Sequence, residues 1–193
     1  MSKVFQPRRG FTTQSRVAQR TLGKKLAFGP NPEGIIQIRI KPMPQSLVQI
    51  YVHIVFSTKH RQALLQDSQL RKRLHAYLAG ICKNLQCPTL IIGGIEDHVH
   101  LLCRWGKNIN IADFILETKR DSSKWIKAEQ PSMADFYWQN GYGAFSISPA
   151  HVEALKEYIT NQEEHHRRET FQKEFRRLCK KYGLAIDERY VWD

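Results

Sequence analysis

Apolar and polar positions follow regular periods from about residue 45 onward and predict four strands. Residues 47–57 are rich in β-branched and aromatic side chains, which is typical of a buried strand. Residues 89–92 form a second candidate strand, which Gly93-Gly94 would end, and residues 99–103 form a third. Residues 137–148 predict a fourth strand, which its glycines would bend.

Helical spacing of apolar residues separates these strands and follows the last of them. The first predicted helix begins at a cap, Asp67 or Ser68, and its apolar face consists of Leu70, Leu74, Leu78, Ile81 and Leu85. The second begins at Asn110 and carries Ile111, Phe114, Ile115, Thr118, Trp125 and Ile126. The third begins at Ser148-Pro149, and its helical pattern continues to about Tyr182 after a break.

The predicted order is strand, helix, strand, strand, helix, strand, helix. It indicates an α+β fold, namely a ferredoxin-like split β-α-β sandwich with an antiparallel sheet and an added C-terminal helix. The 193 residues are enough for one domain with a substantial core and too few for two full domains. No apolar run approaches the roughly 20 residues needed to span a bilayer, so no membrane partner is expected.

Residues 1–42 differ in character from residues 43–193. They show no sustained period, and they contain nine basic residues against one acid, although the whole chain carries a formal net charge of only +12. We expect a disordered basic extension that could add non-specific affinity for phosphates. An alternative is that translation normally begins at Met43. Most of the excess positive charge lies in residues 1–42. The net charge is therefore only weak evidence that the folded part binds nucleic acid.

The cysteines indicate a reducing compartment. Cys82, Cys87, Cys103 and Cys179 form no Cys-x-x-Cys pair, which favours reduced thiols in a cytoplasmic protein over a disulfide framework or a zinc site.

Candidate chemistry begins at His98-Val99-His100. Side chains two apart on a strand point to the same face, so the two histidines could hold one metal ion while Val99 and Leu101 face the core. Two ordinary histidines on an exposed strand face are an equally reasonable interpretation, because His-x-His is short and common.

A second candidate lies on the last long helix. Tyr158 and Gln162 are four residues apart and therefore share a face. If that face covers the sheet near the histidines, Gln162 could offer an oxygen ligand and Tyr158 a nucleophile. Taken alone, this segment fits a core or interface tyrosine with a solvated glutamine better.

Other polar residues carry less weight. His165-His166 lies among charged residues and predicts a solvated helix surface, while His53 and His151 are isolated in the sequence. The sequence contains no phosphate-binding P-loop, no dinucleotide-binding glycine motif and no nucleophile elbow.

Five ordered motifs together resemble the single-tyrosine HUH transposases of bacterial insertion sequences, with REP-associated tyrosine transposases as more distant relatives. The motifs run from about Met43 to the end of the chain: residues 51–59, Asp97-His98-Val99-His100-Leu101-Leu102, Trp138 with residues 141–146, Tyr158-Ile159-x-Asn161-Gln162, and Tyr190-Val191-Trp192-Asp193. Members of this family tend to begin near the equivalent of Met43, so residues 1–42 depart from the pattern.

The resemblance implies a role for each matching residue. His98 and His100 would ligate a divalent ion, Mg²⁺ or Mn²⁺, and Gln162 would complete the protein ligands. Tyr158 would attack single-stranded DNA to give a 5′-phosphotyrosine link and a free 3′-OH, which later rejoins strands. The resemblance also implies a bacterial cytoplasmic homodimer that recognises DNA hairpins at element ends, with an active site that can be shared between subunits.

The DNA contacts and the reaction class leave alternatives open. Lys119, Arg120, Lys124 and Lys127 could follow the DNA backbone, although a solvated helix face explains each of them equally well. A transposase-derived regulator that binds hairpins without cutting, or a rolling-circle replication nickase, would share most of these residues. An RNA-binding module on the same fold would need aromatic residues where this chain has histidines.

Overall fold

The protein was analysed as a computed structural model that describes residues 47–192. The predicted extension at residues 1–42 lies outside the described residues. Four antiparallel strands form one sheet in the order β2-β3-β1-β4. They are β1 (Tyr51–Ser57), β2 (Thr89–Gly94), β3 (His98–Arg104) and β4 (Gly143–Ile147). This order confirms the predicted split β-α-β sandwich.

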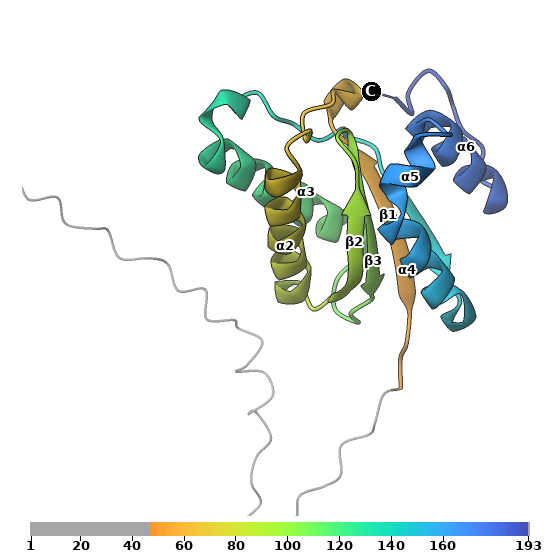
Figure 1. Ribbon diagram of the computed structural model, residues 1–193. Helices are drawn as coiled ribbons and strands as arrows, with labels where there is room; N and C mark the ends of the chain where they lie inside the picture. Colours follow the sequence, from red (N-terminus) through yellow and green to blue (C-terminus); the bar gives the residue numbers. More distant parts are fainter. Residues whose placement is uncertain (1–46, 193) are drawn as a thin grey trace, which may run out of the picture. The chain divides into compact units, whose positions relative to one another are not determined.

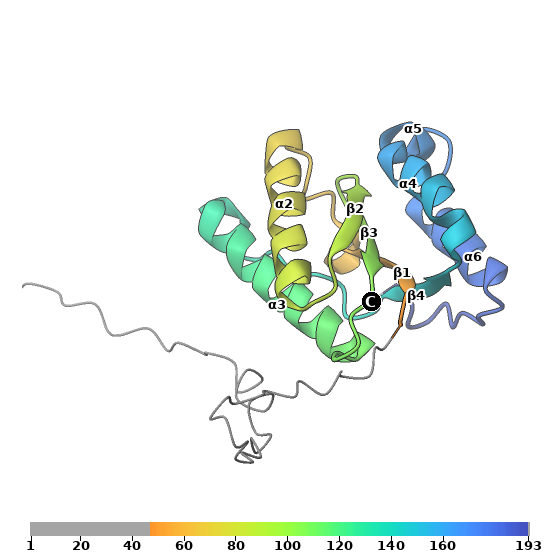
Figure 2. The same ribbon diagram turned by 90° about the horizontal axis from the view of Figure 1, so that it is seen from below.

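Two helices cover one face of the sheet, and the C-terminal helices cover the other (Figure 1; Figure 2). The first face carries α2 (Ser68–Asn84) and α3 (Ile111–Glu129). The second carries α4 (Val152–Thr160), α5 (Gln162–His166) and α6 (Phe171–Lys181). Short 3₁₀ turns occupy Lys59–Arg61, Pro131–Met133 and Pro149–His151.

Side-chain caps fix where the long helices begin. The Asp67 side chain accepts a hydrogen bond from the backbone N–H of Gln69, and Asn110 does the same for Asp113. Both caps were predicted from the sequence. Thr170 caps α6 through the backbone N–H of Lys173. Each cap satisfies a donor that the first helical turn would otherwise leave unpaired.

Strand alternation divides the apolar side chains between two cores. Ile54, Phe56 and Leu101 belong to a main core that includes side chains of α2 and α3. On the other face, Val55 packs with residues of α6, and Leu102 packs with residues of α4. This second core holds the C-terminal helices against the sheet.

Several predicted boundaries were wrong. The first strand begins at Tyr51 rather than residue 47, and the fourth is confined to Gly143–Ile147. Ser148 makes no side-chain cap, and its proline opens a 3₁₀ turn before α4. The predicted C-terminal helix is three helices, and the turn at residues 167–170 between the last two reverses the chain toward the sheet. None of the described helices is long and apolar enough to cross a membrane.

Candidate active site

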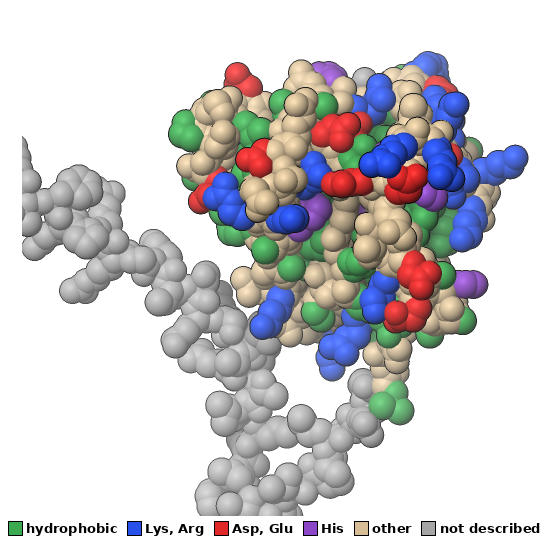
Figure 3. Space-filling model, viewed as in Figure 1, with side chains coloured by type: hydrophobic (Ala, Val, Ile, Leu, Met, Phe, Trp, Pro, Cys, Tyr) green, Lys and Arg blue, Asp and Glu red, His purple; other side chains and the backbone are tan. Residues whose placement is uncertain are grey.

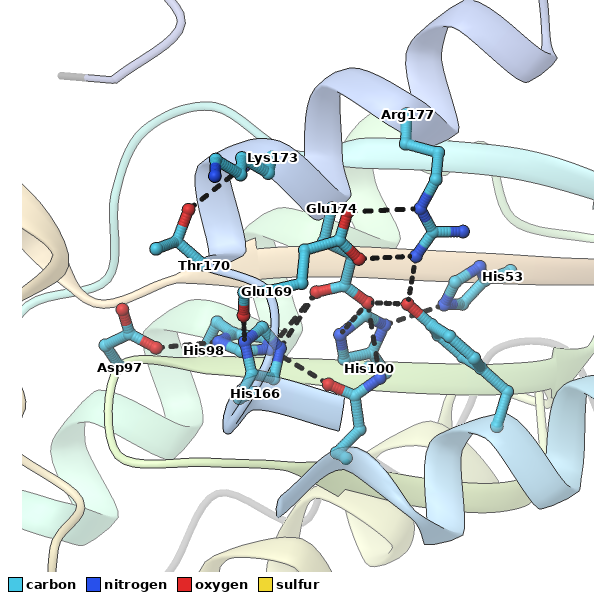
Figure 4. Close-up of polar contacts among 12 residues, drawn as sticks. His53, Asp97, His98, His100, His166, Glu169, Thr170, Lys173, Glu174 and Arg177 are labelled. Atoms are coloured by element: carbon cyan, nitrogen blue, oxygen red, sulfur yellow. Dashed lines mark hydrogen bonds and ion pairs between the residues drawn. The ribbon is translucent and has the colours of Figure 1, made fainter. Parts of the chain in front are cut away.

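The site forms where β3 passes beneath the C-terminal helices. His98 and His100 are fully buried on this side of the sheet, whereas Val99 and Leu101 lie in the main core as expected. His166 from α5 joins them, and its ring centroid lies 4.6 Å from that of His98. Figure 4 shows the three imidazoles around the carboxylate of Glu174, which descends from α6.

Each imidazole is held from behind by a hydrogen bond at Nδ1. His98 Nδ1 lies 2.7 Å from Asp97 Oδ1, and His166 Nδ1 donates to the carbonyl oxygen of Glu169 at 2.8 Å. His100 Nδ1 lies 2.9 Å from Nε2 of the buried His53. All three rings therefore turn Nε2 toward Glu174.

Glu174 is the only acidic residue that is fully buried among the described residues. Its carboxylate lies 3.0 Å from His166 Nε2, 3.4 Å from His100 Nε2 and 3.7 Å from His98 Nε2. Burial alone would raise the pKa of this carboxyl, but the His100 and His166 imidazoles outweigh burial and hold the pKa well below its usual range. Glu174 is therefore a buried negative charge.

Burial and the Glu174 carboxylate act in opposite directions on the nearby histidines. Burial lowers the pKa of His100 despite the nearby carboxylate, and burial together with His100 lowers the pKa of His53. His166 is less enclosed; burial opposes its protonation, but the hydrogen bond to Glu174 raises its pKa. His100 and His166 thus face the same carboxylate but differ in their tendency to carry a proton.

Tyr158 reaches this cluster from α4. Its hydroxyl donates a hydrogen bond to Glu174 Oε1, and the Arg177 guanidinium donates to the hydroxyl oxygen at 3.0 Å. Its ring centroid lies 6.2 Å from that of His100. Burial and Glu174 raise the pKa of Tyr158, while Arg177 opposes that rise.

Gln162 begins α5 and completes the buried group. Its Oε1 lies 3.3 Å from His98 Nε2, and its Nε2 donates to Glu174 Oε1 at 3.2 Å. The structure thus brings together all four candidates for catalysis and metal binding, His98, His100, Tyr158 and Gln162, within one chain.

A cavity of about 530 Å³ opens beside Tyr158. Its lining includes His53, His151, Arg177 and Lys181. The cavity therefore joins a positively charged wall to the tyrosine and to the histidine behind it.

The four basic residues predicted to contact DNA lie elsewhere, on α3 and across the sheet from the histidines. Lys119 is turned inward, where its Nζ donates to the carbonyl oxygens of Gln139 and Gly141 at 2.7 Å each. Burial lowers the pKa of Lys119 to about 8. These contacts give it a structural role in the 139–141 loop.

The other three line an open groove of about 570 Å³ with the exposed rings of Tyr137 and Tyr142. Arg120 is paired with Glu117 and Asp121, and Lys127 lies over the ring of Tyr137 at 3.6 Å. Lys124 lines the same groove.

Sequence reasoning missed several members of the site. The prediction of a solvated His165-His166 surface is wrong for His166, whose side chain is only 7% exposed. Glu174 did carry a signal, because it shares the apolar face of α6 with Phe171, Phe175 and Leu178. An acid at such a position needs a buried partner.

The donor set suits a metal ion. His98, His100, His166 and Glu174 each offer one ligand atom, and these atoms lie within 4.8 Å of one another. His100 Nε2 is buried and makes no hydrogen bond. Imidazole nitrogens and a carboxylate oxygen are common ligands of first-row divalent ions, so these residues fit such an ion.

Solved structures that are similar to this chain include the following two. One is a protein from Deinococcus radiodurans R1 that is assigned as a transposase, with 23% identity and a TM-score of 0.49 over 64% of this chain and 98% of that one. The other is a REP-associated tyrosine transposase bound to a REP hairpin, with 11% identity and a TM-score of 0.48 over 66% of this chain and 74% of that one. Among proteins of curated function, none matches this sequence.

The sequence itself carries the assignment. A sequence model of the family described as "Transposase IS200 like" matches residues 46–162. The matched segment contains all four strands, His98, His100, Tyr158 and Gln162. Because it spans more than half of the chain, this protein belongs to the IS200-like transposase family.

Proposed function

We propose that this protein cleaves and rejoins single-stranded DNA at the ends of an insertion sequence, with Tyr158 as the nucleophile. The observation that carries the proposal is the position of the Tyr158 hydroxyl, which lies between Arg177 and a buried cluster of histidines in the same chain. A tyrosine needs such help, because its reference pKa of about 10 leaves it protonated at neutral pH.

In the proposed reaction the Tyr158 oxygen forms a bond to phosphorus as the bond from phosphorus to O3′ breaks. The tyrosine proton passes to Glu174 Oε1, which already accepts a hydrogen bond from that hydroxyl. The O3′ leaving group takes a proton from water and becomes a free 3′-OH, and the hydroxide that remains takes the proton from Glu174 and restores its charge. The 5′-phosphotyrosine link keeps the phosphodiester energy, so a later attack by a 3′-OH rejoins strands without a nucleotide cofactor.

Arg177 has two functions in this proposal. Its guanidinium lies against the tyrosine oxygen, where it favours the charge that grows as the proton leaves. Arg177 also lines the 530 Å³ cavity with Lys181. We place the nucleotides next to the cut in this cavity, because both cations can contact phosphates there.

A divalent cation, Mg²⁺ or Mn²⁺, is the proposed cofactor. His98 and His100 would hold it, with the Gln162 oxygen at their edge. Such an ion would polarise a nonbridging phosphate oxygen and stabilise the charge of the transition state.

Hairpin recognition is assigned to the groove beside α3. Lys124 and Lys127 offer phosphate contacts, and the exposed rings of Tyr137 and Tyr142 offer surfaces on which bases can stack. On the visible face of Figure 3, Lys and Arg also gather over the C-terminal helices. A bound DNA would extend from this groove to Tyr158, and a homodimer would bring two element ends together.

The test uses single-stranded DNA from the flanks of the gene's own locus, end-labelled on either side of the cut. With Mn²⁺ or Mg²⁺, the protein should give a slower, protease-sensitive band on a denaturing gel. Tyr158→Phe should give no band yet still bind hairpin DNA, because the change removes one oxygen and keeps the ring. Hairpin binding without any band from the unaltered protein would instead support a non-cutting, transposase-derived regulator.

A further inference from the structure

Two of the four candidate metal ligands lie beyond the segment that matches the family model. His98 and His100 belong to the matched residues 46–162, whereas His166 and Glu174 follow them on α5 and α6. Figure 4 shows His166 and Glu174 converging on the two strand histidines. The question is whether the four residues form a hydrogen-bonded cluster alone or an ion site.

The hydrogen bonds behind the rings favour an ion site. A carbonyl oxygen only accepts, so the 2.8 Å contact with Glu169 places a proton on Nδ1 of His166. The Asp97 carboxylate likewise favours a proton on Nδ1 of His98. With a proton held at Nδ1, Nε2 is the ring nitrogen that can bind a metal ion in place of its present contacts with Glu174 and Gln162. An outer partner that fixes Nδ1 and frees Nε2 is the usual arrangement of histidines that bind metals.

Electrostatics points the same way. The fully buried Glu174 carboxylate is a negative charge that water does not reach, and three ring nitrogen atoms are turned toward it, so a cation would be favoured at this point. His100 Nε2 is buried without a hydrogen bond, which is costly for a polar atom. One cation at the centre would satisfy the carboxylate and all three nitrogen atoms together.

The distances leave room for such an ion. With ligand bonds of about 2.1 Å, neighbouring ligand atoms lie about 3 Å apart and opposite ones about 4 Å apart. The 3.0 Å separation of His166 Nε2 and Glu174 Oε2 matches the first value, and the full set spans 4.8 Å. Shifts of less than about 1 Å would therefore complete the site.

We infer that the protein binds one first-row transition cation, such as Mn²⁺, through His98, His100, His166 and Glu174. Three imidazoles and one carboxylate suit such an ion better than Mg²⁺, which prefers oxygen ligands and retained water. This inference deepens the proposed function, since it concerns the ion at the same site. It also makes α5 and α6 part of the metal centre.

The experiment is a titration of the full-length protein with Mn²⁺, in which EPR measures the free ion. One Mn²⁺ should bind per chain, and a large excess of Mg²⁺ should not displace it. Glu174→Gln and His166→Asn should each weaken binding by about a hundredfold or more, because loss of outer partners alone costs about 10–100-fold. Unchanged Mn²⁺ affinity in both variants would overturn the inference.

Matched controls come from the neighbouring residues. Glu164 is exposed and paired only with Arg167 and Arg168, so Glu164→Gln should bind Mn²⁺ like the unaltered chain. His165→Asn should do the same, because His165 packs against the Tyr158 ring and is outside the ligand set. Circular dichroism checks that each variant is folded.

A second measurement needs no substitution. Anomalous diffraction from crystals of the full chain grown with Mn²⁺ should place the ion within about 2.3 Å of His166 Nε2 and Glu174 Oε2. An ion bound by His98, His100 and Gln162 alone would refute the inference and leave the proposed function standing. If all four residues bound Mn²⁺ but the protein formed no DNA adduct, the inference would stand and the proposed function would be refuted.

Discussion

Among single residues, Tyr158 has its hydroxyl between two side chains of opposite charge. Glu174 accepts its proton in a hydrogen bond, and Arg177 donates to its oxygen. Burial and Glu174 raise the pKa of the tyrosine, and Arg177 opposes that rise. Reactivity therefore depends on the guanidinium as well as on the hydroxyl.

Arg177→Gln should slow formation of the covalent DNA adduct by about a hundredfold, comparable to the loss of one charge-stabilising donor. A quench-flow time course on the labelled strand measures this rate. Arg176 is a suitable control, because it is paired with Glu188 and touches the Trp192 ring instead. Equal rates for Arg177→Gln and Arg176→Gln would show that Arg177 does not assist the tyrosine.

Lys119 and Lys124 lie on the same helix and should respond differently to substitution. Lys119→Met should lower the free energy of unfolding by about 1–3 kcal/mol, because it removes charge-assisted hydrogen bonds to carbonyl oxygens of the 139–141 loop, one of them partly buried. Denaturant unfolding of Lys119→Met and of Lys124→Met measures this difference in stability. Lys124→Met should instead leave stability unchanged and reduce the salt dependence of hairpin binding by about one phosphate contact.

Local sequence explains why the strand histidines could be found and their partners could not. The two-residue period fixes His98 and His100 on one face from the sequence alone. The apolar face of α6 marks Glu174 as buried, but nothing local to His53, His166 or Glu174 shows that they meet the strand histidines. Tertiary contacts of this kind depend on how the elements pack.

At the scale of elements, the position of α4 depends on a glycine in β2. A Cβ atom built on Gly93 would lie 2.4 Å from the backbone oxygen of Ile159, the residue after Tyr158. The absence of a side chain at Gly93 therefore allows α4 to pack closely on the sheet. This contact sets the depth at which the tyrosine helix lies.

Gly93→Ala should both destabilise the fold and slow DNA cleavage, because α4 must move away from β2 to accommodate the methyl group. Thermal unfolding and the adduct assay measure the two effects. Gly80→Ala in α2 is the matched control, since a Cβ there meets nothing within 4 Å and alanine should stabilise the helix by about 0.5–1 kcal/mol. Normal cleavage by Gly93→Ala would mean that α4 is not held in place by this contact.

The period of apolar residues predicted some of the helices correctly and failed for others. The pattern gave α2 and α3 with their caps at Asp67 and Asn110, because both helices have long apolar faces. It did not divide the C-terminal pattern correctly, since α5 is one short turn of polar residues. That turn and the chain reversal at residues 167–170 bring His166 inward and start α6 over the site.

At the scale of the whole molecule, nucleophile and metal ligands come from a single chain. Tyr158, His98 and His100 meet without a second subunit in the described residues. We therefore expect each subunit of the proposed homodimer to cut with its own tyrosine and its own histidines.

Mixing two inactive variants tests this arrangement. Mixed dimers of Tyr158→Phe and His100→Ala should recover no cleavage, because no single site would contain both groups. Co-expression with two affinity tags isolates the mixed dimer for the adduct assay. Recovery of about one active site per mixed dimer would mean that the tyrosine serves the histidines of the other subunit.

The role of Tyr158 is decided by identifying the peptide that becomes attached to DNA. The protein is incubated with its cleavable strand and Mn²⁺, digested with nuclease and protease, and the modified peptide is sequenced by tandem mass spectrometry. We expect one nucleotide-bearing peptide, with the phosphate on Tyr158. A phosphate on another residue, or cleavage of the strand with no modified peptide, would contradict it.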